Sequence, residues 1–123
     1  MLAAALATAA ALVPVPDGAY RGDAVTLVVR DHRIARVHAT VRRYVCDPFG
    51  DVGPLLIRVA PDAGIARDGR VRFTAGPPSE RLTLTARFAR GGRATGRLRV
   101  RGTIGTGDPC ASPWRRFVVD SER

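Results

Sequence analysis

Apolar and polar side chains alternate with a period of two along much of this chain. In residues 24–31, the alternate positions Val25, Leu27 and Val29 are aliphatic and share one face. Residues 33–46 show the same alternation. A period of two is typical of a β-strand that buries one face. We therefore expect two antiparallel strands here.

The second of these strands has a predicted inward and a predicted outward face. The inward residues are Val37, Ala39, Val41 and Val45, and the outward residues are Arg36, His38, Thr40 and Arg42. Asp31 and His32 separate the two strands, and a two-residue polar connection of this kind predicts a tight hairpin turn.

Further short strands follow, separated by turns rich in Gly, Pro and Asp. They are predicted at residues 55–60, 65–73, 81–90, 93–101 and 113–120, with an Asp-Gly hairpin turn inside residues 65–73. Many short strands separated by turns favour an all-β fold. We expect a single antiparallel β-sandwich or flattened barrel of about eight short strands.

The segment ARFARGGRATGRLRVR, residues 86–101, specifies its own register. Apolar residues fall at even positions on both sides of Gly91 and Gly92. Because directly paired residues share a face of the sheet, both apolar sets face the core only if the loop has an odd number of residues. A three-residue loop with a left-handed glycine fits this requirement. The arginines at odd positions then face solvent: Arg87, Arg93, Arg97, Arg99 and Arg101.

Composition adds a strong positive charge to this picture. The formal net charge is +9, and all 20 basic residues are arginine. Arginine pairs well with phosphate and carboxylate, so the outward arginines are a candidate surface for anionic extracellular polymers. The codon bias of a GC-rich genome is the favoured explanation for arginine without lysine, because proteins that bind nucleic acid rarely lack lysine entirely. Aromatic residues make up only 6% of the chain. We therefore expect sequence-independent electrostatic binding at most, and no sequence-specific recognition of nucleic acid.

The chain begins with an apolar, alanine-rich segment. Residues 1–13 resemble a secretory signal peptide whose basic start is missing, since the first basic residue is Arg21. The alternative is a disordered alanine-rich terminus. The segment is shorter than the roughly 20 apolar residues that span a bilayer, so no transmembrane segment is expected. We expect one β-domain over residues 14–123 and a secreted or cell-envelope location.

Cys46 and Cys110 are the two cysteines of the chain. In an exported protein an even number of cysteines predicts a disulfide, and two cysteines allow one pairing. The alternative is two buried thiols in a cytosolic protein. Trp114 lies close to Cys110 in sequence, and we expect it to pack in the core beside the disulfide.

Candidate catalytic and metal-binding residues are few. The two histidines, His32 and His38, have no serine in a nucleophile-elbow pattern to work with, so no enzyme activity is expected. No cofactor is expected either. The disulfide would bring together three carboxylates that form a weak candidate for a calcium site: Asp47, Asp51 and Asp108.

Several motifs resemble those of small, mostly uncharacterised exported β-rich proteins of high-GC actinobacteria. The similarity covers a G-x-Y-x-G start, two hairpins, and a second cysteine before a tryptophan. The matching residues are Tyr20, Gly22, Cys46, Ile65, Gly69, Phe73, Phe88, Ala94, Gly96, Leu98, Cys110 and Trp114. This resemblance implies export and an all-β fold, and it implies no catalytic residue.

Taken together, these patterns favour an exported, non-enzymatic β-sandwich that acts as a structural or interaction module. One alternative is a weak electrostatic binder of acidic polymers or cell-wall components, which would use the arginine-rich face. A further alternative is a small-ligand carrier, if the sheets close around a cavity.

Overall fold

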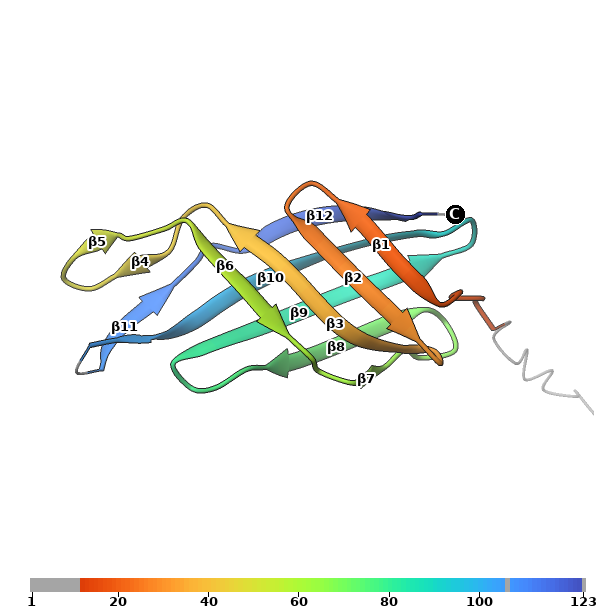
Figure 1. Ribbon diagram of the computed structural model, residues 1–123, viewed down its shortest axis with the longest axis horizontal. Helices are drawn as coiled ribbons and strands as arrows, with labels where there is room; N and C mark the ends of the chain where they lie inside the picture. The colour runs from red at the N-terminus through yellow and green to blue at the C-terminus, as the bar shows by residue number, and fades with distance from the viewer. Residues whose placement is uncertain (1–11, 106, 123) are drawn as a thin grey trace, which may run out of the picture.

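A computed structural model describes residues 12–105 and 107–122 of the protein. Its regular structure consists of β-strands (Figure 1). No helix occurs in these residues. The strands are β1 (Gly18–Gly22), β2 (Val25–Arg30), β3 (Arg33–Val41), β4 (Val45–Cys46), β5 (Gly50–Asp51), β6 (Leu55–Val59), β7 (Ala63–Gly64), β8 (Arg70–Ala75), β9 (Glu80–Ala89), β10 (Arg93–Ile104), β11 (Asp108–Ala111) and β12 (Arg115–Ser121).

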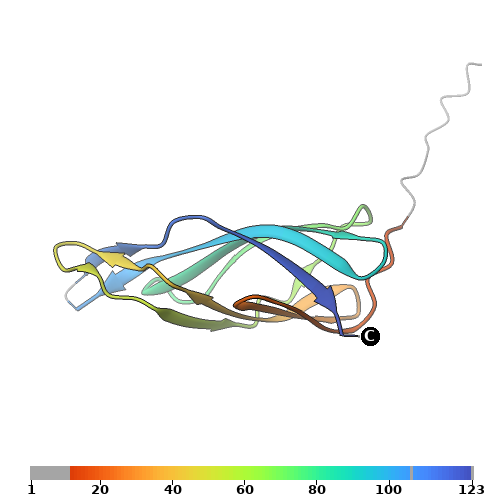
Figure 2. The same cartoon turned by 90° about the horizontal axis from the view of Figure 1, so that it is seen from above.

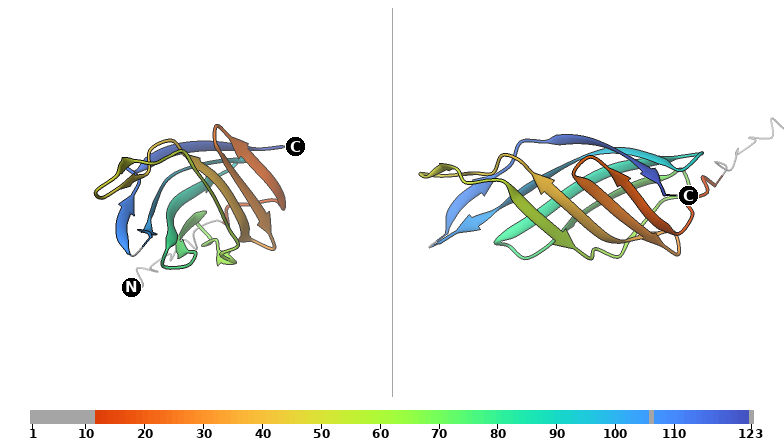
Figure 3. Two further views of the ribbon diagram at one scale, coloured as in Figure 1. Left: turned by 60° about the vertical axis from the view of Figure 1, so that its left-hand side comes forward. Right: turned by 45° about the horizontal axis from the view of Figure 1, so that its top comes forward.

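The strands belong to one antiparallel sheet that folds over on itself into two layers (Figure 2). One layer contains β1, β2, β3 and β6, and the other contains β8, β9, β10 and β12. The sheet is continuous where β1 pairs with β12, and Figure 3 (left) shows how strongly it curves there. The predicted all-β antiparallel fold is confirmed. More than eight strands are present, and β4, β5 and β7 are pairings of only two residues each.

The core lies between the two layers and is built from the alternate, apolar positions of each strand. Leu27 and Val37 of one layer and Leu84 and Leu98 of the other are completely buried. Tyr20 of β1 meets Phe88 of β9 across the core, with the ring centroids 5.2 Å apart and the rings nearly perpendicular. Edge-to-face contact of this kind is a favoured aromatic geometry. The predicted alternation of buried and exposed positions therefore holds in both layers.

The β9–β10 hairpin has the register that strand parity predicts. Ala89 pairs with Arg93, which leaves a three-residue loop of Arg90, Gly91 and Gly92. Both glycines have positive φ, at 87° and 80°, a conformation that side chains with a Cβ rarely adopt. The odd loop length and the left-handed glycine are both confirmed. The apolar residues of both strands consequently face the core.

The first hairpin needs one correction. The predicted turn at Asp31 and His32 is present, with positive φ at both residues. The strand predicted over residues 33–46, however, ends at Val41, and Val45 belongs to the separate strand β4 with 39% of its surface exposed. Alternation alone could not reveal this break, because the chain leaves the layer after Val41 to build an arm at the end of the molecule.

The connection between the layers is also different from the prediction. The segment at residues 65–73 contains the expected turn, and Gly69 has a φ of 87°. Only its second half forms a strand, as part of β8. The first half instead joins the turn, where the Ala66 amide donates to the Arg70 carbonyl at 2.8 Å. This segment carries the chain from β7 of one layer to β8 of the other.

Strands β4, β5 and β11 form an arm at one end of the sandwich (Figure 1). Cys46 of β4 lies directly opposite Cys110 of β11, and the two residues form a disulfide with a Cα–Cα distance of 4.0 Å. The predicted disulfide is confirmed. β10 continues past its predicted end at residue 101 to Ile104 and forms a hairpin with β11.

Most of the predicted leader, residues 1–11, lies outside the described residues. Within the described chain, the Val13 amide donates to the Arg67 carbonyl at 2.8 Å, and Val15 is buried in the core. The chain thus joins the domain from Val13 onward. No helix in the described part of the chain is long and apolar enough to cross a membrane.

Candidate functional site: an arginine-lined groove

The outer face of β8, β9, β10 and β12 is hollowed into a groove with a volume of ≈ 800 Å³. Its floor is the backbone of a row of directly opposed residues at inward positions: Val71 of β8, Ala86 of β9 and Gly96 of β10. Side chains alternate across a strand, so the residues before and after this row point outward. They form the two walls of the groove.

Both walls of the groove carry arginine. One wall contains Arg70, Arg87 and Thr95, and the other contains Arg72, Thr85, Arg97 and Arg116. Each wall follows a line of paired positions across neighbouring strands. The groove therefore runs across the strands, from the edge at β8 to β12.

Two pairs of arginines face each other directly across strands. Arg70 pairs with Arg87, and Arg97 pairs with Arg116. Like charges placed directly opposite are destabilising in antiparallel sheets. An anion held between the two guanidinium groups of a pair would remove this repulsion. The register of the sheet thus creates places where a bound anion is favourable.

The charge of the groove is largely uncompensated. Arg70 lies 3.5 Å from Asp68, while the other four groove arginines form no ion pair with a carboxylate in residues 12–105 and 107–122. Elsewhere in the described chain, five of the fourteen arginines form an ion pair with a carboxylate, as in the contact of Arg33 with Asp62 at 2.7 Å. A guanidinium group can bind carboxylate, sulfate or phosphate through two parallel hydrogen bonds. The groove is therefore suited to bind anions.

Trp114 lies at one end of this face, not in the core. It is 39% exposed, and the guanidinium carbons of Arg97 and Arg99 lie 4.7 and 4.6 Å from its ring centroid. The core position expected for Trp114 is therefore wrong. The hydroxyl of the buried Ser112 accepts from the Val100 amide at 2.8 Å. This bond ties the segment before Trp114 to β10, and the indole of Trp114 consequently lies over Arg97 and Arg99.

The five arginines singled out in the sequence have different surroundings. Arg87 and Arg97 line the groove, and Arg99 packs on Trp114. Arg93 instead donates to Asp120 at 2.8 Å, and this hydrogen bond and the negative charge raise the pKa of Arg93 above its ordinary value. Arg101 is exposed and lies outside the groove, opposite another arginine of β9.

Three groove arginines were not singled out by the sequence reasoning: Arg70, Arg72 and Arg116. Arg70 and Arg72 alternate with Val71 and Phe73, so the same period-two signal could have found them. Arg116 could not have been placed beside Arg97, because β12 pairs with β10 and not with β11, the strand that precedes it in sequence.

The weak calcium candidate is not assembled. The carboxylates of Asp47, Asp51 and Asp108 do not form a cluster, and the described residues contain no group of three or more potential metal ligands. Asp51 instead accepts hydrogen bonds from the amides of Tyr44 at 3.3 Å and Gly53 at 3.0 Å, which stabilise the turn of the arm. The two histidines lie apart from the groove, in the first hairpin turn and on the outer face of β3.

No protein-family model matches this chain, and neither a curated protein nor a solved structure is significantly similar to it. Its function therefore has to be inferred from the site itself.

Proposed function

We propose that this protein is a non-enzymatic interaction module that binds an anionic polymer through the arginine groove. The observation that carries this proposal is the placement of five arginines along two facing walls, four of them without a carboxylate partner in the described chain. The groove crosses four strands, a distance of roughly 14 Å at about 4.8 Å per strand. This length fits several charged units of a polymer better than a single small anion.

The binding expected here is electrostatic. Each arginine that neutralises an anionic group releases a counterion, so the affinity falls as the salt concentration rises. Positive charge in a concave surface also attracts a polyanion over a distance and raises its rate of association. Neither effect distinguishes one order of polymer units from another. This agrees with the sequence-independent binding expected from the small number of aromatic residues.

The compartment is part of the proposal. The Cys46–Cys110 disulfide supports an oxidising environment outside the cytoplasm, since disulfides are rare in reducing compartments. The apolar start of the chain and its resemblance to exported actinobacterial proteins agree with this location. The polymers accessible there include acidic polysaccharides and acidic cell-wall components. Nothing in the geometry favours the small-ligand carrier, since the side chains between the two layers pack into a core.

Binding to immobilised polygalacturonate and to immobilised inorganic polyphosphate tests this function. The variant Arg97→Gln/Arg116→Gln should lose about tenfold in affinity for both polymers at low salt, roughly 1.4 kcal/mol, because it removes two of the charges that bind the polymer. The matched control, Arg36→Gln/Arg58→Gln, removes the same charge from the exposed outer face of the other layer. It should change affinity much less. No binding at low salt, or equal losses in both variants, would contradict the proposal.

A further inference from the structure

A second hollow lies next to the arginine groove and has Trp114 in its wall. Its volume is ≈ 380 Å³. Residues 41–43, where β3 ends, form one side, and residues 112–116, which lead from β11 into the start of β12, form the other. We call this hollow the Trp114 pocket. Arg116 lines both the pocket and the groove, so the two form neighbouring parts of one surface.

The Trp114 pocket combines an apolar wall with cationic groups. The indole of Trp114 and the ring of Pro113 supply flat apolar surface. Arg42 and Arg116 are exposed and have no carboxylate partner among the residues that the structure describes. A ligand group suited to this pocket has an apolar face and carries a negative charge at its edge.

The pocket is held in place from two sides. The disulfide at Cys110 anchors the start of the segment that leads to Trp114. Ser112 then exchanges two hydrogen bonds with Val100, since its amide donates to the Val100 carbonyl at 2.8 Å and its hydroxyl accepts from the Val100 amide at 2.8 Å. A wall fixed in this way loses little conformational entropy when a ligand binds.

Two ring chemistries could occupy such a pocket, a sugar and a nucleobase. Single-stranded nucleic acid is usually bound by several aromatic side chains on which successive bases stack. The outer face of β8, β9, β10 and β12 has Trp114 as its single aromatic side chain within the described chain. Thr85 and Thr95 stand among the groove arginines and offer hydroxyl groups that match those of a sugar chain. These features favour a sugar.

We propose that the Trp114 pocket is the end subsite of the groove and holds one ring of an acidic polysaccharide. The apolar face of the sugar packs on Trp114, and its carboxylate or sulfate group binds Arg42 and Arg116. The adjoining units of the chain extend into the groove toward β8. This inference rests on the proposed function, because it assigns the class of polymer that the groove binds.

The chain contains a single tryptophan, so its fluorescence reports on the pocket and on the Arg97 and Arg99 side chains that contact its ring. Short oligogalacturonate, inorganic polyphosphate and oligothymidylate of equal total charge are titrated into the protein at low salt. We expect oligogalacturonate to change the intensity or wavelength of the Trp114 emission, and this change to depend on Arg42. Polyphosphate, which reaches Trp114 only through Arg97, should change the emission less and independently of Arg42.

Two variants separate the pocket from the groove. Trp114→Leu and Arg42→Gln should each weaken oligogalacturonate binding about tenfold, the effect of losing roughly 1.4 kcal/mol. Arg42→Gln should leave polyphosphate binding nearly unchanged, since Arg42 does not line the groove. Arg36→Gln is the charge-matched control, and circular dichroism together with the thermal midpoint establishes that each variant is folded.

The possible results are distinct. If the three polymers bind equally and Arg42→Gln affects none of them, the subsite is wrong while the proposed function stands. If oligothymidylate changes the emission and depends on Trp114 more than oligogalacturonate does, the pocket holds a nucleobase and the sugar assignment is overturned. If none of the polymers binds at low salt, the proposed function itself fails.

Discussion

Gly96 of β10 lies between the core on one face of the sheet and the groove on the other, and the packing on both faces depends on its lack of a side chain. A Cβ at this position would lie 2.3 Å from the Thr85 carbonyl oxygen and 2.8 Å from the Phe117 ring. Real side chains do not approach this closely, so any larger residue forces the backbone of the groove floor to move. The absence of a side chain at Gly96 thus allows Phe117 to pack in the core and the backbone of the groove floor to keep its position.

The substitution Gly96→Ala should therefore lower the free energy of unfolding by about 1–3 kcal/mol, the usual cost of overpacking a core. Urea denaturation measures this loss. Thr95→Ala, on the same strand but with an outward side chain, is the control and should change stability by less than about 0.5 kcal/mol. A fully stable Gly96→Ala variant would show that the packing described for Phe117 is wrong.

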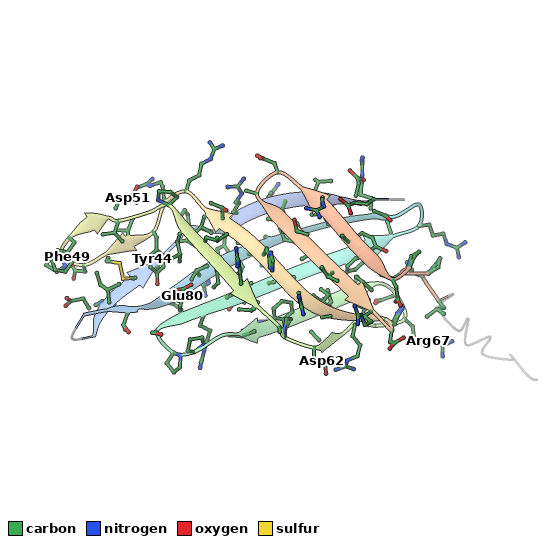
Figure 4. All side chains as sticks on the ribbon, viewed as in Figure 1. Tyr44, Phe49, Asp51, Asp62, Arg67 and Glu80 are labelled. Atoms are coloured by element: carbon green, nitrogen blue, oxygen red, sulfur yellow. A yellow bond between two sulfur atoms is a disulfide. The ribbon has the colours of Figure 1, made fainter. Side chains whose placement is uncertain are left out.

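Tyr44 is a buried residue with an unusual environment. Its hydroxyl has no hydrogen-bond partner within the described residues, and Glu80 lies nearby at the same end of the molecule (Figure 4). Burial, and to a lesser extent the charge of Glu80, raises the pKa of Tyr44 above its ordinary value. Folded protein therefore retains this proton at a pH where the unfolded chain has lost it.

This pKa shift predicts how stability depends on pH. The contribution of Tyr44 is fully present below the ordinary tyrosine pKa of about 10 and is lost as the pH rises above it. Tyr44→Phe should reduce this alkaline loss, as measured by denaturation at several pH values. At neutral pH the variant should be at least as stable as the wild type, because it removes an unsatisfied buried hydroxyl. A large loss at neutral pH would mean that the hydroxyl has a partner after all.

At the scale of the strands, the pairing of β10 with β12 places Arg97 opposite Arg116. Arg116→Gln should raise the free energy of unfolding by about 0.2–1 kcal/mol at low salt, because it removes a like-charge cross-strand pair. The gain should disappear at high salt, where the charges of the wild type are screened. Arg36→Gln is the control, because Arg36 faces Val28 and not another arginine. An unstable Arg116→Gln variant would contradict the repulsion.

The disulfide between β4 and β11 closes a loop with a sequence separation of 64. Restricting the unfolded chain in this way contributes about 4 kcal/mol in the chain-entropy model. The variant Cys46→Ser/Cys110→Ser should lose a comparable amount in denaturant titrations. A reductant should destabilise the wild type and leave the double variant unchanged. Equal stabilities of the wild type and the variant in the absence of reductant would contradict this contribution.

Local patterns in the sequence predicted the parts of the fold that depend on local geometry. The β9–β10 register follows from the positions of the apolar residues and the glycines, and the disulfide follows from there being only two cysteines. Trp114 and Arg116 were not predictable in this way. Their positions depend on β12 pairing with β10 and with the distant β1 instead of with β11, which precedes it, and alternation does not reveal which strands are neighbours. The groove could be recognised only once these neighbours were known.

At the scale of the whole molecule, the folded sheet has two outer faces, and both carry arginine. The formal net charge of +9 attracts polyanions to the molecule as a whole. The groove differs from the rest of the surface because it concentrates five arginines around a concave floor. The central claim is therefore one of location: a polyanion binds to the outer face of β8, β9, β10 and β12.

Mapping backbone amide chemical shifts in the ¹⁵N-labelled protein while oligogalacturonate is added tests this claim most directly. We predict that the largest shifts occur at the groove floor, at Val71, Ala86 and Gly96, and around Trp114, and that they reverse when salt is added. Shifts of equal size at Arg36 and Arg58 on the other layer would mean that the ligand responds to net charge alone. Shifts confined to that layer would show that the ligand binds the opposite face of the molecule, and this result would contradict the claim.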